Sequence, residues 1–230
     1  MAFLESSCVR TVLTPSVLDC CNAFSCGNED LDSFFRNDSV NYSRQLMGKT
    51  YAFVDADSLR DIVCAFTVSN ASIFTNYLPN ARKKQIGKNL PWEKRDLIYP
   101  AVLIGRLGVN NSFKKMHVGS ELLDYIKQWF VDPDNKTGCR YLVVDAYNQP
   151  VPLAFYEANG FKYMFSSDDY SGAAEPPVRR SESHHSRPRE PPIYSSFVWS
   201  NSACCCRAGF HKPVRASRLP TRSLEAHAML

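Results

Sequence analysis

YPAVLIGRLGVNNSFKKMHVGSELLDYIKQWF, residues 99–130, is the stretch that decides how this chain folds. Its first part, residues 99–109, is a continuous apolar and partly β-branched run, which is typical of a strand buried on both faces. From Gly119 onward the apolar residues recur every three or four positions, which predicts an amphipathic helix with one face in a core. The stretch therefore predicts a buried strand, a short loop and a helix in direct succession.

The loop between strand and helix, residues 110–117, carries Lys114 and Lys115. The first amides of a helix have no intrahelical partner and lie at the positive end of its dipole, and Gly119 allows a ligand to approach them closely. A basic loop ahead of a helix therefore favours an anion site, with phosphate as the natural ligand. A plain connection with two solvated lysines is the alternative that spacing alone leaves open.

The same stretch resembles the acetyl-CoA-binding motif of the GNAT superfamily of N-acetyltransferases. In that motif a strand reading like RLGV is followed by a basic residue or Gln, two residues, Gly, one residue and Gly. The corresponding residues here are Lys114, Lys115, Met116, His117, Val118 and Gly119. The second glycine is present, and His117 replaces the first. Its imidazole would either crowd the pyrophosphate or donate a hydrogen bond to it.

The resemblance implies where acetyl-CoA binds. The pantetheine would run beside the strand residues Leu107, Gly108 and Val109, where a backbone amide would polarise the thioester carbonyl. The pyrophosphate would lie on the loop that ends at Ser120. Gly108 is expected either to ease an irregular strand or to serve as a packing position.

The segment GCRYLVVDAYNQPVPLAFYEANGFKYMF, residues 138–165, predicts a buried strand at 141–146, a short helix at 153–158 and a further strand at 161–165. It closely resembles the second GNAT signature, V-D-A-x-N followed by F-Y-x-x-N-G-F. The resemblance implies that Tyr156 is the catalytic acid that protonates or hydrogen-bonds the leaving thiolate. It also implies that Asn148 contacts the cofactor or orients this region. Core packing of Tyr156 and helix capping by Asn148 are the alternatives.

Near the N-terminus, the phrase F-x-C-G-N-x-x-L-D-x-F resembles GNAT proteins related to toxins of toxin–antitoxin pairs. It is matched by Phe24, Cys26, Gly27, Asn28, Leu31, Asp32 and Phe34. In this phrase Asn28 is expected to cap a helix. The resemblance implies a tRNA acceptor, an antitoxin protein as partner and a homodimer. Residues 9–22 predict a first strand with a proline interruption, and residues 51–54 and 62–68 predict a hairpin.

The segment 76–96 is polar and basic, and its position just before the central strand suggests a path for an anionic substrate such as RNA. A solvated surface loop is the alternative. Its cations are Arg82, Lys83, Lys84, Lys88, Lys94 and Arg95.

Composition limits the remaining classes of function. The chain of 230 residues is 44% hydrophobic, enough for a full core, and has no run long enough to span a membrane. The N-terminus lacks the pattern of a signal peptide, so a cytoplasmic location is expected. The nine cysteines show no repeated metal spacing, and neither a metal site nor a disulfide is expected.

The segment 171–230 differs from the rest of the chain. It has nine Lys and Arg against four Asp and Glu, a net charge of +5, and removing it from the total of +4 leaves residues 1–170 at −1. It also contains seven of the 14 prolines. Either the run IYSSFVW, residues 193–199, supplies a last strand, or the tail is disordered, or a shifted reading frame has replaced the native end.

These observations predict a single α/β domain over residues 1–170, with a mixed, mainly antiparallel sheet splayed at its centre and helices on both faces. The predicted function is N-acetyl transfer from acetyl-CoA to a primary amine. The more specific prediction is that this amine is the amino group of an aminoacyl-tRNA. A catalytically weak acyl-CoA-binding or scaffold protein is the alternative, which His117 favours.

Overall fold

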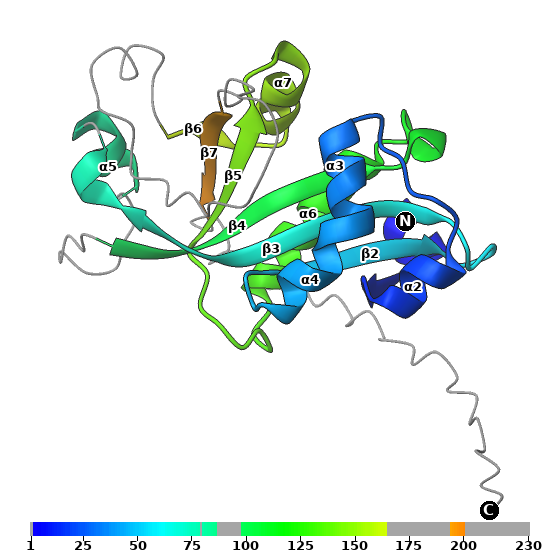
Figure 1. Ribbon diagram of the computed structural model, residues 1–230. Coiled ribbons are helices and arrows are strands. Elements are labelled where there is room, and N and C mark those ends of the chain that lie inside the picture. Colours follow the sequence, from blue (N-terminus) through cyan, green and yellow to red (C-terminus); the bar gives the residue numbers. More distant parts are fainter. Residues whose placement is uncertain (1, 79, 87–97, 165–193, 201–230) are drawn as a thin grey trace, which may run out of the picture.

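The computed structural model describes residues 2–78, 80–86, 98–164 and 194–200. They form a seven-stranded sheet with the order β1-β2-β3-β4-β5-β7-β6 (Figure 1). Every neighbouring pair is antiparallel except β4 and β5, which confirms the predicted mixed, mainly antiparallel sheet. The strands are β1 (Cys8–Val12), β2 (Lys49–Asp55), β3 (Ile62–Phe74), β4 (Ile98–Val109), β5 (Tyr141–Tyr147), β6 (Lys162–Tyr163) and β7 (Tyr194–Ser200).

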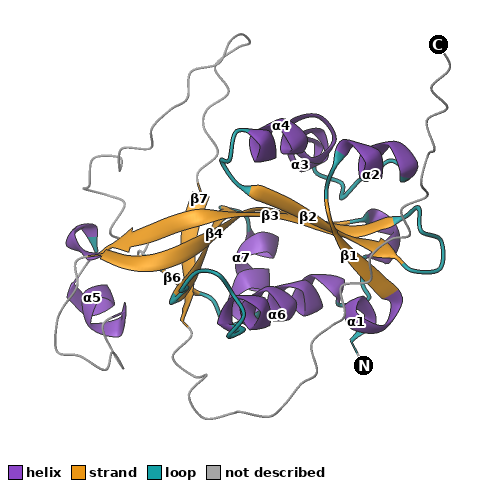
Figure 2. Ribbon diagram, turned by 90° about the horizontal axis from the view of Figure 1, so that it is seen from below, coloured by secondary structure: helices purple, strands orange, loops and turns teal. Residues whose placement is uncertain are grey.

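Helices cover both faces of this sheet (Figure 2). On one face lie α2 (Pro15–Cys20), α3 (Glu29–Ser33) and α4 (Ser39–Arg44), with a π-helical turn, Phe34–Asp38, joining α3 to α4. On the other face lie α1 (Phe3–Ser7), α6 (Val118–Val131) and α7 (Pro150–Ala158). The short helix α5 (Asn80–Ile86) lies at the far end of the long β3 and β4 strands (Figure 1).

The core on the α6 side explains why the central stretch organises the fold. Leu122, Leu123 and Ile126 of α6 are fully buried against Phe66 of β3 and Ile104 of β4. Burying one such side chain contributes about 1.5–3 kcal/mol relative to leaving it in water. The predicted apolar stripe of the helix is thus the face that packs on the predicted buried strand.

The sheet opens between its two central strands. The parallel ladder of β4 and β5 runs from the pair Ala101–Tyr141 to the pair Ile104–Val144, and in the described part of the chain it extends no farther. β4 continues to its end paired with β3, whereas β5 continues paired with β7. This confirms the predicted splay and leaves residues 105–109 of β4 with an edge that faces the opening.

A β-bulge lies where the two strands separate. The β3–β4 register shifts between Thr67 and Val68, which pair with Arg106 and Ile104, so Gly105 has no partner in β3. A bulge of one residue bends and twists its strand. A Cβ at Gly105 would meet nothing within 4 Å and its φ is not positive, so neither packing nor backbone strain explains a glycine at this position.

The prediction of one interrupted strand over residues 9–22 was wrong. β1 ends at Val12, and α2 begins at Pro15, whose ring suits a first helical turn because that turn needs no N–H there. The Thr14 hydroxyl accepts the N–H of Val17 at 3.4 Å and caps the helix. The predicted cap at Asn28 is confirmed, since its side-chain oxygen accepts the N–H of Leu31 at 3.2 Å.

The C-terminal half follows the predicted order with different bounds. Helix α7 begins at Pro150, earlier than expected, and the predicted stop is confirmed by Gly160, which has φ +80°. β6 covers Lys162–Tyr163 only, and Phe165 lies outside the described residues.

The run at residues 193–199 supplies a strand, as one of the alternatives expected. β7 pairs with β5 along its whole length, and its Phe197 is fully buried. The sheet thus includes a strand from beyond residue 170. The predictions for residues 171–193 and 201–230, including Cys204, Cys205 and Cys206, lie outside the described residues.

Candidate functional site

The loop between β4 and α6, residues 110–117, is called the anion loop below. It leads directly into the 14-residue helix α6, whose N-cap is His117. The N–H groups of Ser120 and Glu121 donate to the His117 carbonyl at 3.0 and 3.1 Å and close the first turn. The amides of Val118 and Gly119 come before that turn, at the positive end of the helix dipole.

Two residues of the anion loop have left-handed backbone conformations. Lys115 has φ +69° and His117 has φ +59°. This region costs an L-residue about 1–2 kcal/mol, whereas glycine adopts it freely. The conformation explains why a glycine suits the position of His117. Both side chains are exposed.

Gly119, the second motif glycine, lies against α7. A Cβ built there would be 3.2 Å from two ring atoms of Phe155 and 3.7 Å from a methyl group of Val109. Phe155 in turn packs against Tyr156, with 5.1 Å between the ring centroids. Phe155 therefore links the start of α6 to the predicted catalytic tyrosine, and the end of β4 approaches the same glycine.

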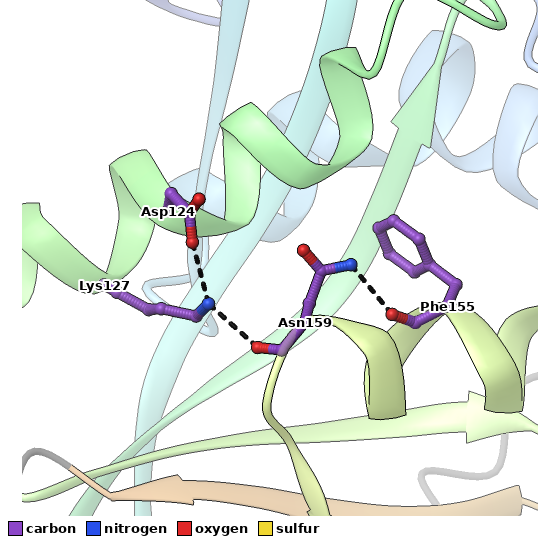
Figure 3. A network of polar contacts seen from close by, with 4 residues as sticks. All are labelled: Asp124, Lys127, Phe155 and Asn159. Carbon is purple, nitrogen blue, oxygen red and sulfur yellow. Dashed lines mark hydrogen bonds and ion pairs between the residues drawn. The ribbon is translucent and has the colours of Figure 1, made fainter.

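A polar network fixes α7 relative to α6 (Figure 3). The Lys127 ammonium group donates to the Asp124 carboxylate and to the Asn159 carbonyl, both at 2.9 Å. The Asn159 amide donates to the Phe155 carbonyl at 2.8 Å, and the Phe155 ring points from α7 toward α6. The Lys127 side chain is 13% exposed and lies over the rings of Phe161 and Trp199, and its ammonium group thus satisfies the carbonyl end of α7.

Tyr156 is buried in an aromatic cluster. Its ring centroid lies 5.7 Å from that of Phe161 and 5.8 Å from that of Phe197. Burial raises the pKa of its hydroxyl above the ordinary value of 10. The raised pKa keeps the phenol neutral. Among the described residues no group hydrogen-bonds to this hydroxyl, so its proton is available for donation to a ligand.

Lys114, the first basic residue of the motif, has a partner inside the protein. Its ammonium group donates to the Cys26 carbonyl at 2.8 Å. Lys115 is exposed and has the left-handed backbone conformation noted above. Of the two lysines expected to hold a pyrophosphate, the structure therefore engages Lys114 with the N-terminal segment and presents Lys115 to solvent.

Asp32 of α3 holds the segment that Lys114 contacts. Its carboxylate accepts the hydroxyl of Ser25 at 2.8 Å and the N–H of Cys26 at 2.7 Å. Burial raises the pKa of Asp32, but hydrogen bonds from Cys26, Ser25 and Gly27 together outweigh it, and the net pKa is lowered. The charged carboxylate is thus the form that the fold stabilises.

The lowered pKa of Asp32 predicts an acid-dependent stability difference. Because the folded-state pKa lies below the ordinary 3.8, the stabilisation is complete above about pH 5 and is lost as pH falls through the folded-state pKa. Urea unfolding of the wild type and of Asp32→Ala should show a gap in unfolding free energy that narrows from neutral pH to about pH 3. A gap of constant size would contradict an ionised Asp32 in this role.

On the opposite face of the sheet, Arg106 lies where β4 leaves β5. Its guanidinium group is 5.1 Å from the Phe34 ring centre and donates to the Gly105 carbonyl at 2.8 Å, while its buried Nε has no partner in the described structure. Nearby, the Tyr147 hydroxyl at the end of β5 donates to the Asp30 carboxylate at 2.7 Å. This bond ties α3 to the far strand of the opening.

The other predicted site residues are placed as follows. Leu107 and Val109 pack toward α6. Gly108 faces Cys26 and Phe35 instead, and a Cβ there would be 3.2 Å from both, so this glycine is explained by close packing. Gly105, which the sequence analysis missed, forms the bulge, and a glycine inside a strand pattern was the available signal. Met116 is 46% exposed, Val118 is buried, Ser120 lies in the first turn of α6 and Asn148 is exposed in the turn after β5.

The basic segment is described only in part. Arg82, Lys83 and Lys84 lie on α5, away from the anion loop along β4 (Figure 1), and Lys88, Lys94 and Arg95 lie outside the described residues.

The cysteines at positions 8, 20, 21, 26, 64 and 139 are free, and burial raises the pKa of the Cys26 thiol to about 11. Within the described ranges no three potential metal ligands cluster, and no helix has the length and apolar character to cross a membrane.

Solved structures with this fold come from GNAT-type acetyltransferase toxins of toxin–antitoxin systems. A Tyr-to-Phe variant of KacT matches with a TM-score of 0.57 at 19% identity, over 71% of this chain and 91% of its own. AtaT complexed with acetyl-methionyl-tRNAfMet matches with a TM-score of 0.56 at 20% identity, over 70% and 91%.

A Tyr-to-Phe variant of the toxin AtaT, bound to the C-terminus of the antitoxin AtaR and to acetyl-CoA, matches with a TM-score of 0.51 at 15% identity, over 85% of this chain and 94% of its own. No family model matches the sequence. The likeness concerns the fold, and it confirms the predicted α/β architecture with a mixed, mainly antiparallel sheet.

Proposed function

We propose that this chain, which has the fold of the GNAT-type toxins, is an N-acetyltransferase that transfers the acetyl group of acetyl-CoA to a primary amine. One observation carries the proposal. The β4–β5 ladder ends at Ile104 and Val144, so β4 presents an open edge that leads directly into the anion loop and the start of α6. A strand edge beside a helix N-terminus suits a ligand with both amide groups and phosphates.

The residues at this opening fit such a donor. Backbone groups of Leu107 to Val109 are available to the amides of a pantetheine arm, as in the addition of a strand. The helix amides at Val118 and Gly119 and the ammonium group of Lys115 suit a pyrophosphate. Tyr156 lies behind Gly119 through Phe155, on the same side of the sheet.

Acetyl-CoA, when bound, supplies a thioester whose carbonyl carbon accepts the amine. A backbone amide of residues 107–109 would donate to the carbonyl oxygen as it gains negative charge. The Tyr156 hydroxyl would donate a hydrogen bond to the sulfur. A C–N bond forms, the C–S bond breaks, and the proton lost by the amine balances the proton gained by the thiolate. Because burial raises its pKa, Tyr156 suits hydrogen-bond donation better than complete ionisation.

For the acceptor we propose the amino group of an aminoacyl-tRNA. AtaT, which shares the fold, has been solved with acetyl-methionyl-tRNAfMet. In this chain the half-buried guanidinium group of Arg106, with its unpartnered Nε, lies on the α3 side of the opening and suits a phosphodiester. An antitoxin partner belongs to the same proposal, since AtaT has also been solved with part of the antitoxin AtaR. A homodimer remains a prediction from the resemblance.

Acetyl transfer from labelled acetyl-CoA to a panel of aminoacyl-tRNAs tests this function. Uncharged tRNA and simple amines such as spermidine serve as parallel acceptors. Label on the amino acid of charged tRNA alone would support an aminoacyl-tRNA acceptor. Label on simple amines alone would restrict the function to small acceptors. Absence of transfer to every acceptor, with acetyl-CoA bound, would favour the scaffold alternative.

His117 is the observation that favours this alternative, a CoA-binding protein with weak activity. Replacing His117 by Gly removes a left-handed L-residue that costs about 1–2 kcal/mol, although the unfolded chain gains up to about 1 kcal/mol of entropy. We therefore expect slightly higher thermal stability. Because the imidazole would no longer crowd the pyrophosphate, we also expect acetyl-CoA binding that is about three-fold to ten-fold tighter, measured by calorimetry. Leu59→Gly is the matched control, because Leu59 is exposed with φ +54° and lies in the turn after β2.

Three outcomes of this comparison differ in meaning. A gain in stability for both variants with tighter binding only for His117→Gly would show that the imidazole hinders the donor. Weaker binding by His117→Gly would show instead that the imidazole contacts the donor. Binding by the variant and none by the wild type would mean that His117 has disabled the donor site, and a scaffold that does not bind acyl-CoA would then be the better explanation.

A further inference from the structure

The N-terminal segment at residues 25–27 is joined to the anion loop by three hydrogen bonds. The N–H of Asn111 donates to the Ser25 carbonyl at 2.9 Å, and its side-chain amide donates to the Ser25 hydroxyl at 3.4 Å. The Lys114 ammonium group donates to the Cys26 carbonyl at 2.8 Å. These contacts connect segments that are more than 80 residues apart in the chain.

Gly27 allows the two segments to come this close. It has φ +79°, and a Cβ at this position would be 3.1 Å from the Asn111 side-chain oxygen and 3.2 Å from the Lys114 ammonium nitrogen. Any other residue would be strained by the backbone and crowded by both side chains. The glycine of the C-G-N phrase is thus explained by its contact with the anion loop.

Asp32 fixes the segment from the other side. Its two carboxylate oxygens accept the Ser25 hydroxyl and the Cys26 N–H, so it orients the two residues whose carbonyls receive Asn111 and Lys114. Hydrogen bonds to a charged carboxylate are about twice as strong as neutral ones. The path from Asp32 through residues 25–27 to the anion loop therefore consists of hydrogen bonds of 2.7–2.9 Å, apart from the 3.4 Å bond of the Asn111 side chain.

The anion loop needs such support from outside. Lys115 and His117 have left-handed backbones that L-residues avoid, so the loop retains this shape only where surrounding contacts impose it. Lys114, whose ammonium group donates to the Cys26 carbonyl, directly precedes Lys115, the first of the two left-handed residues. It restrains the loop at the point where its backbone turns toward α6.

We propose that Asp32 is a positioning residue for the donor: through residues 25–27 and Lys114 it holds the anion loop in the shape that receives the donor's pyrophosphate. The inference rests on the proposed function and assigns a role to the C-G-N phrase. Asp32 lies beneath the loop and contacts the donor only through this path.

The first test uses the free protein and hydrogen–deuterium exchange. Asp32→Ala should increase exchange of the peptide covering residues 110–117 by about five-fold or more, because the loop loses its support. Lys114→Met removes the same link without altering the turn at residues 25–27 and should have the same local effect. Glu29→Ala and Lys136→Met are the controls, since both residues are exposed and neither touches the path. Exchange in this peptide like that of the wild type in both test variants would overturn the inference.

The second test separates positioning from general loss of structure. Asp32→Ala and Lys114→Met should weaken acetyl-CoA binding about ten-fold, which corresponds to the loss of a charged hydrogen bond. Acetyl-pantetheine has the thioester and the amides but lacks the nucleotide pyrophosphate. Its rate of acetyl transfer at equal concentration should be the same in the wild type and in Asp32→Ala, whereas a merely misfolded variant would lose activity with both donors.

The outcomes also separate this inference from the proposed function. Equal affinity of wild type and variants for acetyl-CoA, or equal loss with both donors, would overturn the role of Asp32 and leave the acetyltransferase function standing. No binding of acetyl-CoA by the wild type would overturn the proposed function and, with it, the role of Asp32. Hydrogen–deuterium exchange of residues 110–117 in the free protein would then show only how the fold stabilises this loop.

Discussion

Tyr156→Phe should lower kcat for acetyl transfer by about 100-fold while the dissociation constant for acetyl-CoA changes less than about two-fold. The substitution removes only the hydroxyl, and the ring contacts with Phe155, Phe161 and Phe197 remain. A hydrogen bond made mainly to the developing thiolate affects the transition state and not the bound donor. Steady-state kinetics and calorimetry on the same preparation measure the two effects.

The same variant should be at least as stable as the wild type. No described residue hydrogen-bonds to the hydroxyl, so its removal breaks no hydrogen bond within the described part of the chain, and the ring contacts remain. Tyr163→Phe is the matched control, because Tyr163 also packs against Phe197, at 4.2 Å between ring centroids. An unchanged kcat in Tyr156→Phe, or an equal loss in both variants, would assign Tyr156 to the core alone.

Gly119→Glu should weaken acetyl-CoA binding by about 100-fold or more. Two effects act together. The side chain would displace the Phe155 ring, which lies 3.2 Å from the position of its Cβ, and the carboxylate would occupy the positive end of α6 that suits a phosphate. Calorimetry with acetyl-CoA measures the loss, and thermal unfolding shows how much of it reflects damage to the fold.

Two further variants separate these effects. Gly119→Ala introduces the contact with Phe155 without a charge and should cause a smaller loss of affinity. Gly138→Glu adds the same carboxylate in an exposed loop, where a Cβ meets nothing within 4 Å, and should bind like the wild type. Normal binding by Gly119→Glu would place the donor's pyrophosphate elsewhere than on the anion loop.

Local sequence patterns predicted most of the elements on which the site depends. The apolar run of β4, the amphipathic stripe of α6 and the stop at Gly160 were read correctly, because strand and helix periods and glycine conformations are local properties. The error at residues 9–22 arose from β-branched residues on both sides of Pro15. Thr14 and Pro15 start a helix there, and tertiary context decided between the two states.

The role of Lys114 could not be read from the sequence. Its partner, the Cys26 carbonyl, is 88 residues away, and a motif match assigns a lysine to a ligand without showing what else it can reach. The bulge at Gly105 is different, because a glycine inside a strand is a visible signal. What the sequence lacked was the register of β3 against β4, which decides whether Gly105 or Gly108 is the irregular position.

By itself, the sequence determined the strand–loop–helix order of β4, the anion loop and α6, since these rest on residues close together in the chain, whereas the splayed sheet was expected from the resemblance to the GNAT superfamily. Only the tertiary structure decided that β7 pairs with β5, that Phe155 fills the space beside Gly119 and that Asp32 supports the anion loop. These features depend on contacts between distant residues. Their geometry is set when the layers pack, and no local period records it.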